Sequence, residues 1–409
     1  MTTEALKFKK ITLPSDKDSS GRNLGNEEIE LLSQVINSGT LNCTAGTMVK
    51  QFEEEFAETY VAKYCITAAS GTASIHTAIA AINPEPGEEI ITTAITDMGG
   101  LTPIVYQGAI PVFADVDPFT YNITAETISR VITDKTKAII VTHLFGNPCD
   151  MGPIMELAKK HRIQVIEDCA QAYFAEYKGQ RVGKIGDIGC FSLQQGKHMT
   201  TGEGGICITD DPHLARHMRL FVNKAWGYGD ENPDHYFLAL NYRMTELQGA
   251  VALAQLRKVG NVIKNRQETA HYLNGKIFDV VGIVPPQITH DSTHVYWKYV
   301  PRTDDDLLQC SVVEFAEYLK KFGIYSAPRY IKKPAFMCQV FSEPKTFGNS
   351  QWPFNQRKIE YDPEDYLGTY EALKHMLVIP WNEFYTIEQV DFIIASICQT
   401  VDHFLKESK

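Results

Sequence analysis

The chain has 409 residues and a formal net charge of −11, with 44% hydrophobic and 22% charged residues. This balance is typical of a folded globular protein, and at roughly 100–200 residues per domain the length predicts two or three domains. The acidic charge argues against broad binding to nucleic acid, which requires clustered Lys and Arg.

Other sequence features exclude further classes of protein. No run approaches the roughly 18 consecutive apolar residues of a membrane span. The N-terminal stretch MTTEALKFKKITLPSDKDSSG has no apolar core of a secretory signal. Nine cysteines, an odd number without a C-x-x-C pair, argue against a disulfide scaffold or a zinc site. We therefore expect a reduced, cytoplasmic protein with no metal, no membrane contact and no nucleic-acid partner.

Short β-branched runs, bounded by Gly, Pro or Asp, alternate with helical segments between about residues 60 and 260. The runs that predict strands are residues 88–95, 110–116, 137–144, 163–168, 188–193 and 205–209. Residues 151–162 have the pattern of a surface helix. This alternation predicts an α/β domain with a largely parallel, buried sheet.

The C-terminal part of the chain has its own helix signals. Thr245 with Gln248, and Thr386 with Gln389, form possible capping boxes, and apolar residues follow the second box at helical spacing. We place a domain boundary near residue 260, between a large α/β domain (1–260, with an N-terminal arm) and a smaller α+β domain (261–409). Residues 341–371, rich in Pro, Gly, aromatic and charged residues, are predicted to form a long loop or lid.

The first candidate binding feature is the sequence Ser70-Gly71-Thr72, which comes directly before a helical apolar pattern. The N-terminus of a helix offers unpaired backbone N–H groups to an anion such as phosphate. An ordinary helix N-cap accounts for the same residues equally simply.

The second feature is Asp168, at the end of an apolar strand. Ligands of α/β sheets bind at the carboxyl ends of strands, and a buried carboxylate needs a partner such as a protonated ring nitrogen. A helix N-cap is again the alternative.

The third feature is Lys197, in a Gly- and Thr-rich turn after the strand 188–193. Desolvation there would lower the pKa of its amine and make it a nucleophile toward carbonyls, whereas an exposed turn would leave it solvated. Ser192, five residues earlier, and Asn241 with Arg243, before the helix at 245, are further possible ligands of phosphate or carboxylate. Together these features outline a site for pyridoxal phosphate, with its aldehyde on the lysine and its ring nitrogen on the aspartate.

Five motifs in this order resemble the DegT/DnrJ/EryC1/StrS family, whose members are fold-type I pyridoxal phosphate enzymes. The motifs are SGTA (70–73), GAIPVFADVD (108–117), VIEDCAQA (165–172), GDIGCFS followed by the lysine and TTGEGG (186–205), and NYRM (241–244). The resemblance runs from about residue 20 to 260 and more loosely to the end. It implies an aspartate aminotransferase-like fold and a sugar or cyclitol aminotransferase.

The resemblance also implies roles for single residues around the pyridine ring. Lys197 would form the Schiff base with the cofactor, Asp168 would hold the pyridine nitrogen, and Gln171 would lie beside the ring hydroxyl. Relatives that dehydrate sugars carry His at the position of the lysine; here Lys197 holds that position and His198 is its neighbour, which favours transamination. The aromatic residue that usually stacks on the ring has no clear counterpart, because Asp97 falls at about that position.

The phosphate end of the cofactor is assigned in the same way. The resemblance implies that Gly71, Thr72 and Ser192 bind the phosphate within one subunit. Asn241 would reach the phosphate in the neighbouring subunit, which implies a homodimer with shared active sites. Arg243 and Arg329 are candidates for binding the carboxylate of the amino donor.

The expected reaction is a two-stage transfer of an amino group. The donor is an amino acid, glutamate or glutamine, and the acceptor is a nucleotide-linked keto sugar or a keto cyclitol. Two alternatives stay open. One is a pyridoxal phosphate-dependent sugar dehydratase or epimerase of the same fold. The other is a non-catalytic regulator that binds pyridoxal phosphate.

Overall fold

A seven-stranded sheet forms the centre of the computed structural model, which describes residues 11–357 and 360–407. Its strands, in spatial order, are β1 (Tyr64–Ala68), β9 (Gly205–Thr209), β8 (Ile188–Ser192), β5 (Gln164–Asp168), β4 (Thr136–Thr142), β2 (Glu89–Thr93) and β3 (Ile110–Ala114). The strands from β8 to β3 are parallel, whereas β9 is antiparallel to both β8 and β1. The predicted strands and the largely parallel sheet are thus confirmed, and β1 is an additional strand.

Both faces of this sheet are buried under hydrophobic cores. Alternate residues of each strand point to opposite sides, so each strand contributes side chains to both cores. In β4, Ala138 and Ile140 belong to one core and Ile139 and Val141 to the other. Helices α3 (Gly71–Ile82) and α7 (Pro212–Phe221) cover the first face, and α2 (Met48–Tyr60) and α6 (Met151–His161) cover the second. Parallel strands buried on both faces read as continuous apolar runs, which is the pattern in the sequence.

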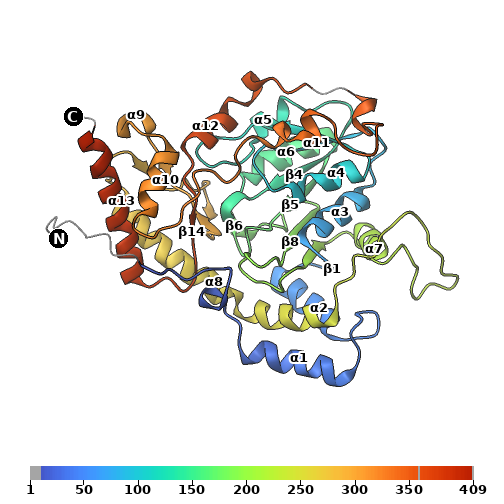
Figure 1. Cartoon of the computed structure of the whole chain (residues 1–409). Helices are drawn as coiled ribbons and strands as arrows, with labels where there is room; N and C mark the ends of the chain where they lie inside the picture. The colour runs from blue at the N-terminus through green and yellow to red at the C-terminus, as the bar shows by residue number, and fades with distance from the viewer. Residues whose placement is uncertain (1–10, 358–359, 408–409) are drawn as a thin grey trace.

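Helix α8 (Glu246–Ile277) is the longest described helix and joins two hydrophobic cores. Thr245 and Gln248 form the predicted capping box at its start. Its first half, through Ile263, packs with the sheet, and its last turns, through Ile277, pack in the second core. The predicted division at residue 260 therefore falls inside a continuous helix (Figure 1). We propose that the two structural units meet along α8 rather than at a linker.

The second core is built from C-terminal helices and very short strands. Helix α13 (Ile387–Glu407) starts at the predicted Thr386–Gln389 box and buries the predicted apolar stripe against α10 (Val312–Lys320). The short strands of the C-terminal half of the chain form pairs: β10 (Ile283–Val284) with β13 (Arg302–Thr303), and β12 (Lys298–Tyr299) with β14 (Ile379–Pro380). Strand β11 (Ser292–Thr293) pairs with β6 (Glu176–Tyr177), which also pairs with β7 (Gln180–Arg181). The other helices of the C-terminal half are α9 (Asp305–Leu308), α11 (Gln339–Ser342) and α12 (Leu367–His375).

The segment predicted as a loop or lid packs against the edge strand β3. The hydroxyl of Tyr361 donates to the carbonyl of Pro111 at 3.4 Å, and that of Tyr366 donates to the carbonyl of Phe113 at 3.3 Å. Phe341 packs edge-on against Phe113. An uncovered edge strand invites pairing with another chain, and this segment covers it.

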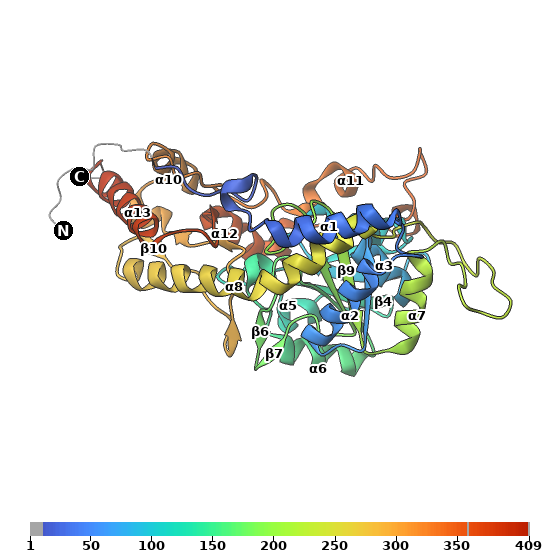
Figure 2. The same cartoon turned by 90° about the horizontal axis from the view of Figure 1, so that it is seen from below.

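The first described residues and one loop lie away from the central sheet. Thr12 lies beside α13, where its carbonyl accepts from Nε2 of Gln389 at 3.4 Å, and α1 (Asn26–Ser38) runs along α8 (Figure 2). The loop that follows α7 extends away from the body in both views (Figures 1 and 2). In the described part of the chain, no helix has the length and apolar character needed to cross a membrane. Residues 1–10 of the N-terminal stretch, where no secretory signal was expected, lie outside the described residues.

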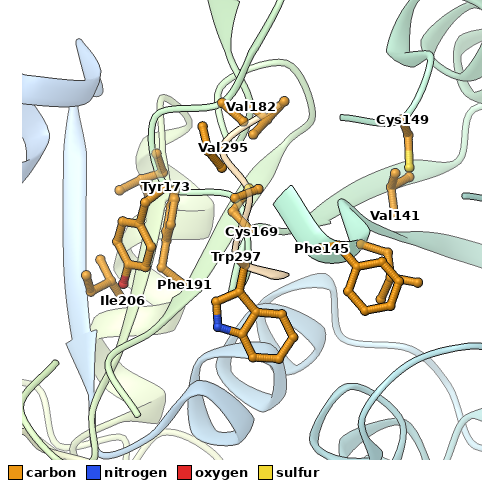
Figure 3. Close-up of a cluster of buried hydrophobic side chains, with 14 of the residues drawn as sticks. Val141, Phe145, Cys149, Cys169, Tyr173, Val182, Phe191, Ile206, Val295 and Trp297 are labelled. Atoms are coloured by element: carbon orange, nitrogen blue, oxygen red, sulfur yellow. The ribbon is translucent and has the colours of Figure 1, made fainter. Parts of the chain in front are cut away.

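The hydrophobic core that contains Ile139 and Val141 of β4 also includes residues from the C-terminal half of the chain. Figure 3 shows Val295 and Trp297 among Cys169, Tyr173 and other side chains of the central sheet and its loops. Trp297 is thereby fixed at the carboxyl ends of the strands, where the candidate site lies.

Candidate active site

A cavity of about 400 Å³ lies at the carboxyl ends of β5 and β8, beside the N-terminus of α3. Six of the seven predicted site residues line it: Gly71, Thr72, Asp168, Gln171, Ser192 and Lys197. Three stretches of the chain, residues 71–72, 168–171 and 192–197, supply these residues, and the parallel strands bring them together because their carboxyl ends share one edge.

The start of α3 forms one end of the cavity. Ser70 is the N-cap, and its hydroxyl accepts a hydrogen bond from the N–H of Ala73 at 3.1 Å. Within the described chain, no hydrogen bond engages the N–H groups of Gly71 or Thr72. A Cβ placed on Gly71 would lie 2.6 Å from the Cβ of Ser192, so only glycine lets the helix start this close to β8. Free N–H groups beside hydroxyl groups form a phosphate cradle.

Asp168 ends β5 and faces the cavity, whereas its neighbour Glu167 faces the protein interior. Glu167 accepts hydrogen bonds from backbone N–H groups, including Gly183 at 2.8 Å, and from His143 at 3.0 Å. Asp168 is 8% exposed, and within the described residues its carboxylate accepts one hydrogen bond, from the N–H of Ala170 at 3.1 Å. Burial raises the pKa of Asp168, and the Ala170 N–H and the charge of Lys197 offset this only in part. A cationic partner such as a protonated ring nitrogen would relieve that cost.

Lys197 lies in the turn after β8, where its N–H donates to the carbonyl of Gln194 at 2.9 Å. Its Nζ lies 4.3 Å from the centre of the Trp297 ring, and no described carboxylate lies within ion-pair distance. Burial lowers the pKa of Lys197 to about 8, although Asp168 and Asp97 act in the opposite direction. The neutral, nucleophilic amine is therefore accessible near physiological pH.

Gln171 connects the cavity to the surrounding loops. Its Oε1 accepts from the N–H of Phe145 at 2.7 Å, and its Nε2 donates to the hydroxyl of Tyr330 at 3.3 Å. Tyr330 and Trp297 both line the cavity, with ring centres 6.0 Å apart and nearly perpendicular planes. Neither residue was predicted, because their segments carry no local motif and reach the site only through tertiary packing.

The cavity wall also holds two acidic side chains, Asp97 and Glu203. Asp97 caps a short 3₁₀ turn (Met98–Gly100) by accepting from the N–H of Gly99 at 2.8 Å. Asp97 therefore lies in the cavity wall, and the aromatic side chains of the cavity come from Trp297 and Tyr330.

The other residues considered from sequence lie outside the cavity. Asn241 is exposed, and its Oδ1 accepts from the N–H of Arg243 at 3.4 Å. Arg243 binds Asn223 through its guanidinium, and Arg329 is exposed beside Tyr330. His198 turns away from the cavity toward the carbonyl of Val295, 3.1 Å from its Nε2, and burial holds the pKa of this imidazole well below its usual range.

The sheet order, the phosphate cradle and the buried lysine and aspartate define the class of fold-type I pyridoxal phosphate-dependent aminotransferases. The model of the DegT/DnrJ/EryC1/StrS aminotransferase family matches residues 22–397. The chain belongs to this family and is an aminotransferase, so the resemblance inferred from the motifs is confirmed.

Individual relatives agree with this assignment. GDP-perosamine synthase of Caulobacter vibrioides is 35% identical over 70% of this chain and 76% of its own. L-glutamine:2-deoxy-scyllo-inosose aminotransferase of Streptomyces kanamyceticus is 34% identical over 74% of each chain. The solved structure of an aminotransferase from Psychrobacter cryohalolentis is 30% identical, has a TM-score of 0.84, and covers 94% of this chain and 98% of that chain.

Proposed function

We propose that this aminotransferase binds pyridoxal phosphate in the cavity at Lys197. It transfers an amino group from glutamate or glutamine to a nucleotide-linked keto sugar or to a keto cyclitol. The observation that carries the proposal is the meeting of a partly neutral lysine amine, a desolvated carboxylate and free helix N–H groups in one cavity. The named relatives act on a sugar nucleotide and on an inosose, which supports this class of acceptor.

Each end of the cavity fits one part of the cofactor. The N–H groups of Gly71 and Thr72, with the hydroxyl of Ser192, would bind the phosphate, and Asp168 would hold the protonated pyridine nitrogen. Gln171 has one amide hydrogen left for the ring hydroxyl after its bond to Tyr330. When bound, pyridoxal phosphate accepts the electrons released when a substrate C–H bond breaks.

The chain's own catalytic work is then proton transfer by Lys197. With the cofactor bound, the free amine of Lys197 would take the proton from Cα of the amino donor as a base and, once protonated, would return a proton as an acid. A pKa of about 8 suits both roles, since the amine is a competent base and its protonated form a competent acid near neutral pH. Asp168 stays ionised against the ring nitrogen, and Trp297 and Tyr330 limit access of water from their side of the cavity.

Replacing Lys197 tests this assignment. Lys197→Ala is expected to lower turnover at least a thousandfold, since both covalent attachment and proton transfer at this position are lost. Lys197→Arg keeps the charge and is expected to be equally inactive. The measurement is formation of 2-oxoglutarate from glutamate, or of 2-oxoglutaramate from glutamine, in the presence of a keto-sugar acceptor. Normal turnover in either variant would overturn the assignment, and sugar conversion without either oxo acid would favour a dehydratase or epimerase.

We further propose a homodimer in which Asn241 completes the partner's phosphate site. Support comes from its exposed position outside the cavity of its own subunit, where it forms a β-bridge with Asn223 just after α7. Mixing inactive Lys197→Ala with an Asn241→Ala variant that binds the phosphate poorly should restore up to about a quarter of wild-type activity, because one hybrid site carries neither substitution. A mixture no more active than its two components would contradict shared sites.

We also propose a reducing, cytoplasmic location. All nine cysteines lie in the described part of the chain and are free thiols, and Cys65, Cys149 and Cys169 are among those fully enclosed in the cores. Buried free cysteines act as small apolar residues, which suits a compartment that keeps thiols reduced.

A further inference from the structure

A buried cluster of charges lies directly behind the turn that carries Lys197. Its centre is Asp16, whose side chain is 10% exposed. Oδ1 of Asp16 accepts from Asn382 at 2.7 Å and from Arg266 at 3.1 Å, and Oδ2 accepts from Lys298 at 3.2 Å. Arg22 is the third cation on the same carboxylate. The cluster thus gathers the N-terminal segment, α8, β12 and the loop before α13 around one acid.

Arg22 links this cluster to the candidate catalytic residue. One guanidinium nitrogen contacts Asp16, and the other donates to the backbone carbonyl of Lys197 at 2.7 Å. The Arg22 side chain is 3% exposed, so this hydrogen bond is shielded from water. A charged donor on a carbonyl makes one of the stronger hydrogen bonds of a protein.

Two further bonds hold the same turn. The indole Nε1 of Trp297 donates to the carbonyl of Gly196 at 2.7 Å, and Nε2 of Gln195 donates to the backbone carbonyl of Asp16 at 2.9 Å. Three successive residues of the turn are therefore fixed from outside it. Among these three bonds, the one from Arg22 is made to Lys197 itself.

We propose that Arg22, held by Asp16, is a positioning residue that fixes the backbone of Lys197 and keeps its amine inside the cavity. The N-terminal segment would then be a working part of the active site rather than a simple arm. Without this bond the turn can move outward and Nζ gains water. This inference rests on the proposed role of Lys197, but the position of the amine can be measured without the reaction.

Chemical labelling of Lys197 provides that measurement. The full-length chain, freed of cofactor, is treated with an amine-acylating reagent between pH 6 and 10.5, and modification of the Lys197 peptide is followed by mass spectrometry, with exposed Lys50 as internal reference. In the wild type the midpoint is expected near pH 8. In Arg22→Gln the midpoint should move upward, since hydration favours the charged amine, and labelling at pH 7.5 should fall about fivefold relative to Lys50.

Arg302 provides the matched control. It is also buried, and it also donates to a backbone carbonyl, that of Pro118, and to a carboxylate, Glu371 at 2.9 Å, but it does not line the cavity. Arg302→Gln is expected to lower the thermal midpoint much as Arg22→Gln does, yet to leave the labelling midpoint of Lys197 unchanged. An equal shift in both variants would show a general loosening and overturn the proposal.

Arg22→Lys separates geometry from charge. It keeps a cation beside Asp16 but cannot span the carboxylate and the carbonyl with a planar fork. We expect it to label like Arg22→Gln, whereas wild-type labelling in either variant would overturn the positioning role. Asp16 keeps Arg266 and Lys298 as partners in both variants, so the fold is expected to persist. If Lys197→Ala were active while Arg22→Gln still shifted the labelling, the proposed function alone would fail.

Discussion

The neighbouring carboxylates Glu167 and Asp168 differ in the number of hydrogen bonds that they accept, and this difference suits them to different roles. Glu167 is saturated by backbone N–H groups and His143, whereas Asp168 has Ala170 N–H as its recorded partner. The pKa of Asp168 is raised above its ordinary 3.8 by burial. The folded chain therefore binds that proton more tightly than the unfolded chain does, and its stability falls as pH rises from about 4 through the folded pKa. At neutral pH, ionised Asp168 costs stability in the cofactor-free chain.

The variant Asp168→Asn should accordingly separate stability from activity. We expect the cofactor-free variant to have an equal or higher thermal midpoint at pH 7.5, while aminotransfer falls at least about a hundredfold because the pyridine nitrogen loses its anionic partner. Glu167→Gln is the matched control, and it should lower the midpoint, since accepted hydrogen bonds are lost. Thermal unfolding and 2-oxoglutarate formation check both. An Asp168→Asn variant that unfolds much earlier than wild type would contradict this reading.

At the scale of elements, the close packing of α3 on β8 makes the proposed phosphate cradle, the free N–H groups of Gly71 and Thr72 beside the hydroxyl of Ser192. Ser70 caps the helix through Ala73, and Gly71 lets the first turn approach Ser192. A helix N-terminus alone is common, but here it points into a cavity that also contains the reactive lysine. The position of the element, rather than its cap, gives it a function.

Substituting Gly71 tests this packing. In Gly71→Ala the new Cβ would meet the Cβ and Oγ of Ser192 at 2.6 and 2.8 Å, so the helix start must shift. We expect pyridoxal phosphate affinity to fall at least about tenfold, as measured by cofactor absorbance in a titration. Gly275→Ala is the control: it lies in α8 with no atom near its added Cβ, and it should keep the affinity and gain about 0.5–1 kcal/mol of stability. Unchanged affinity in Gly71→Ala would contradict the cradle.

At the scale of the whole molecule, Asp16 ties the N-terminal segment to α8 and the C-terminal unit. Burial by itself raises the pKa of Asp16, but attraction to Arg266, Lys298 and Arg22 outweighs burial and holds the pKa well below its usual range. A carboxylate with a lowered folded pKa contributes stability above its unfolded pKa, near 3.8, and loses it progressively as pH falls below that value.

The variant Asp16→Asn should therefore lose about 3–5 kcal/mol of stability at pH 7, since buried Arg22 and Lys298 then lack their anion, whereas Arg266 keeps Glu383 at 2.6 Å. The difference from wild type should shrink below pH 4, where the wild type loses its own contribution. Urea unfolding at several pH values measures this. Asp18→Asn, at an exposed cap in the same segment, is the control and should leave the free energy of unfolding nearly unchanged, since Asn caps as well as Asp does. A difference that stays constant down to pH 3 would contradict the assignment.

Local sequence determined the strands of the parallel sheet, the caps at Thr245 and Thr386, and the motif residues from Gly71 to Lys197. These follow from periodicity and capping chemistry, which act over a few residues. The sequence did not indicate Trp297, Tyr330 or Arg22, because nothing in their neighbours marks them as site residues. The boundary near 260 reflected a change in composition, whereas a single helix runs through that position.

The sequence by itself thus determined the class of fold and the family, and it predicted most of the residues that we propose to hold the cofactor. Only the tertiary structure decided how these residues are held: which aromatic side chains wall the cavity, and how the N-terminal segment reaches the carbonyl of Lys197. The physical reason is the distance along the chain over which each effect acts. Backbone propensities and helix caps depend on a few neighbouring residues, but burial, desolvation and the pairing of Asp16 with cations from distant segments arise only once the chain is packed.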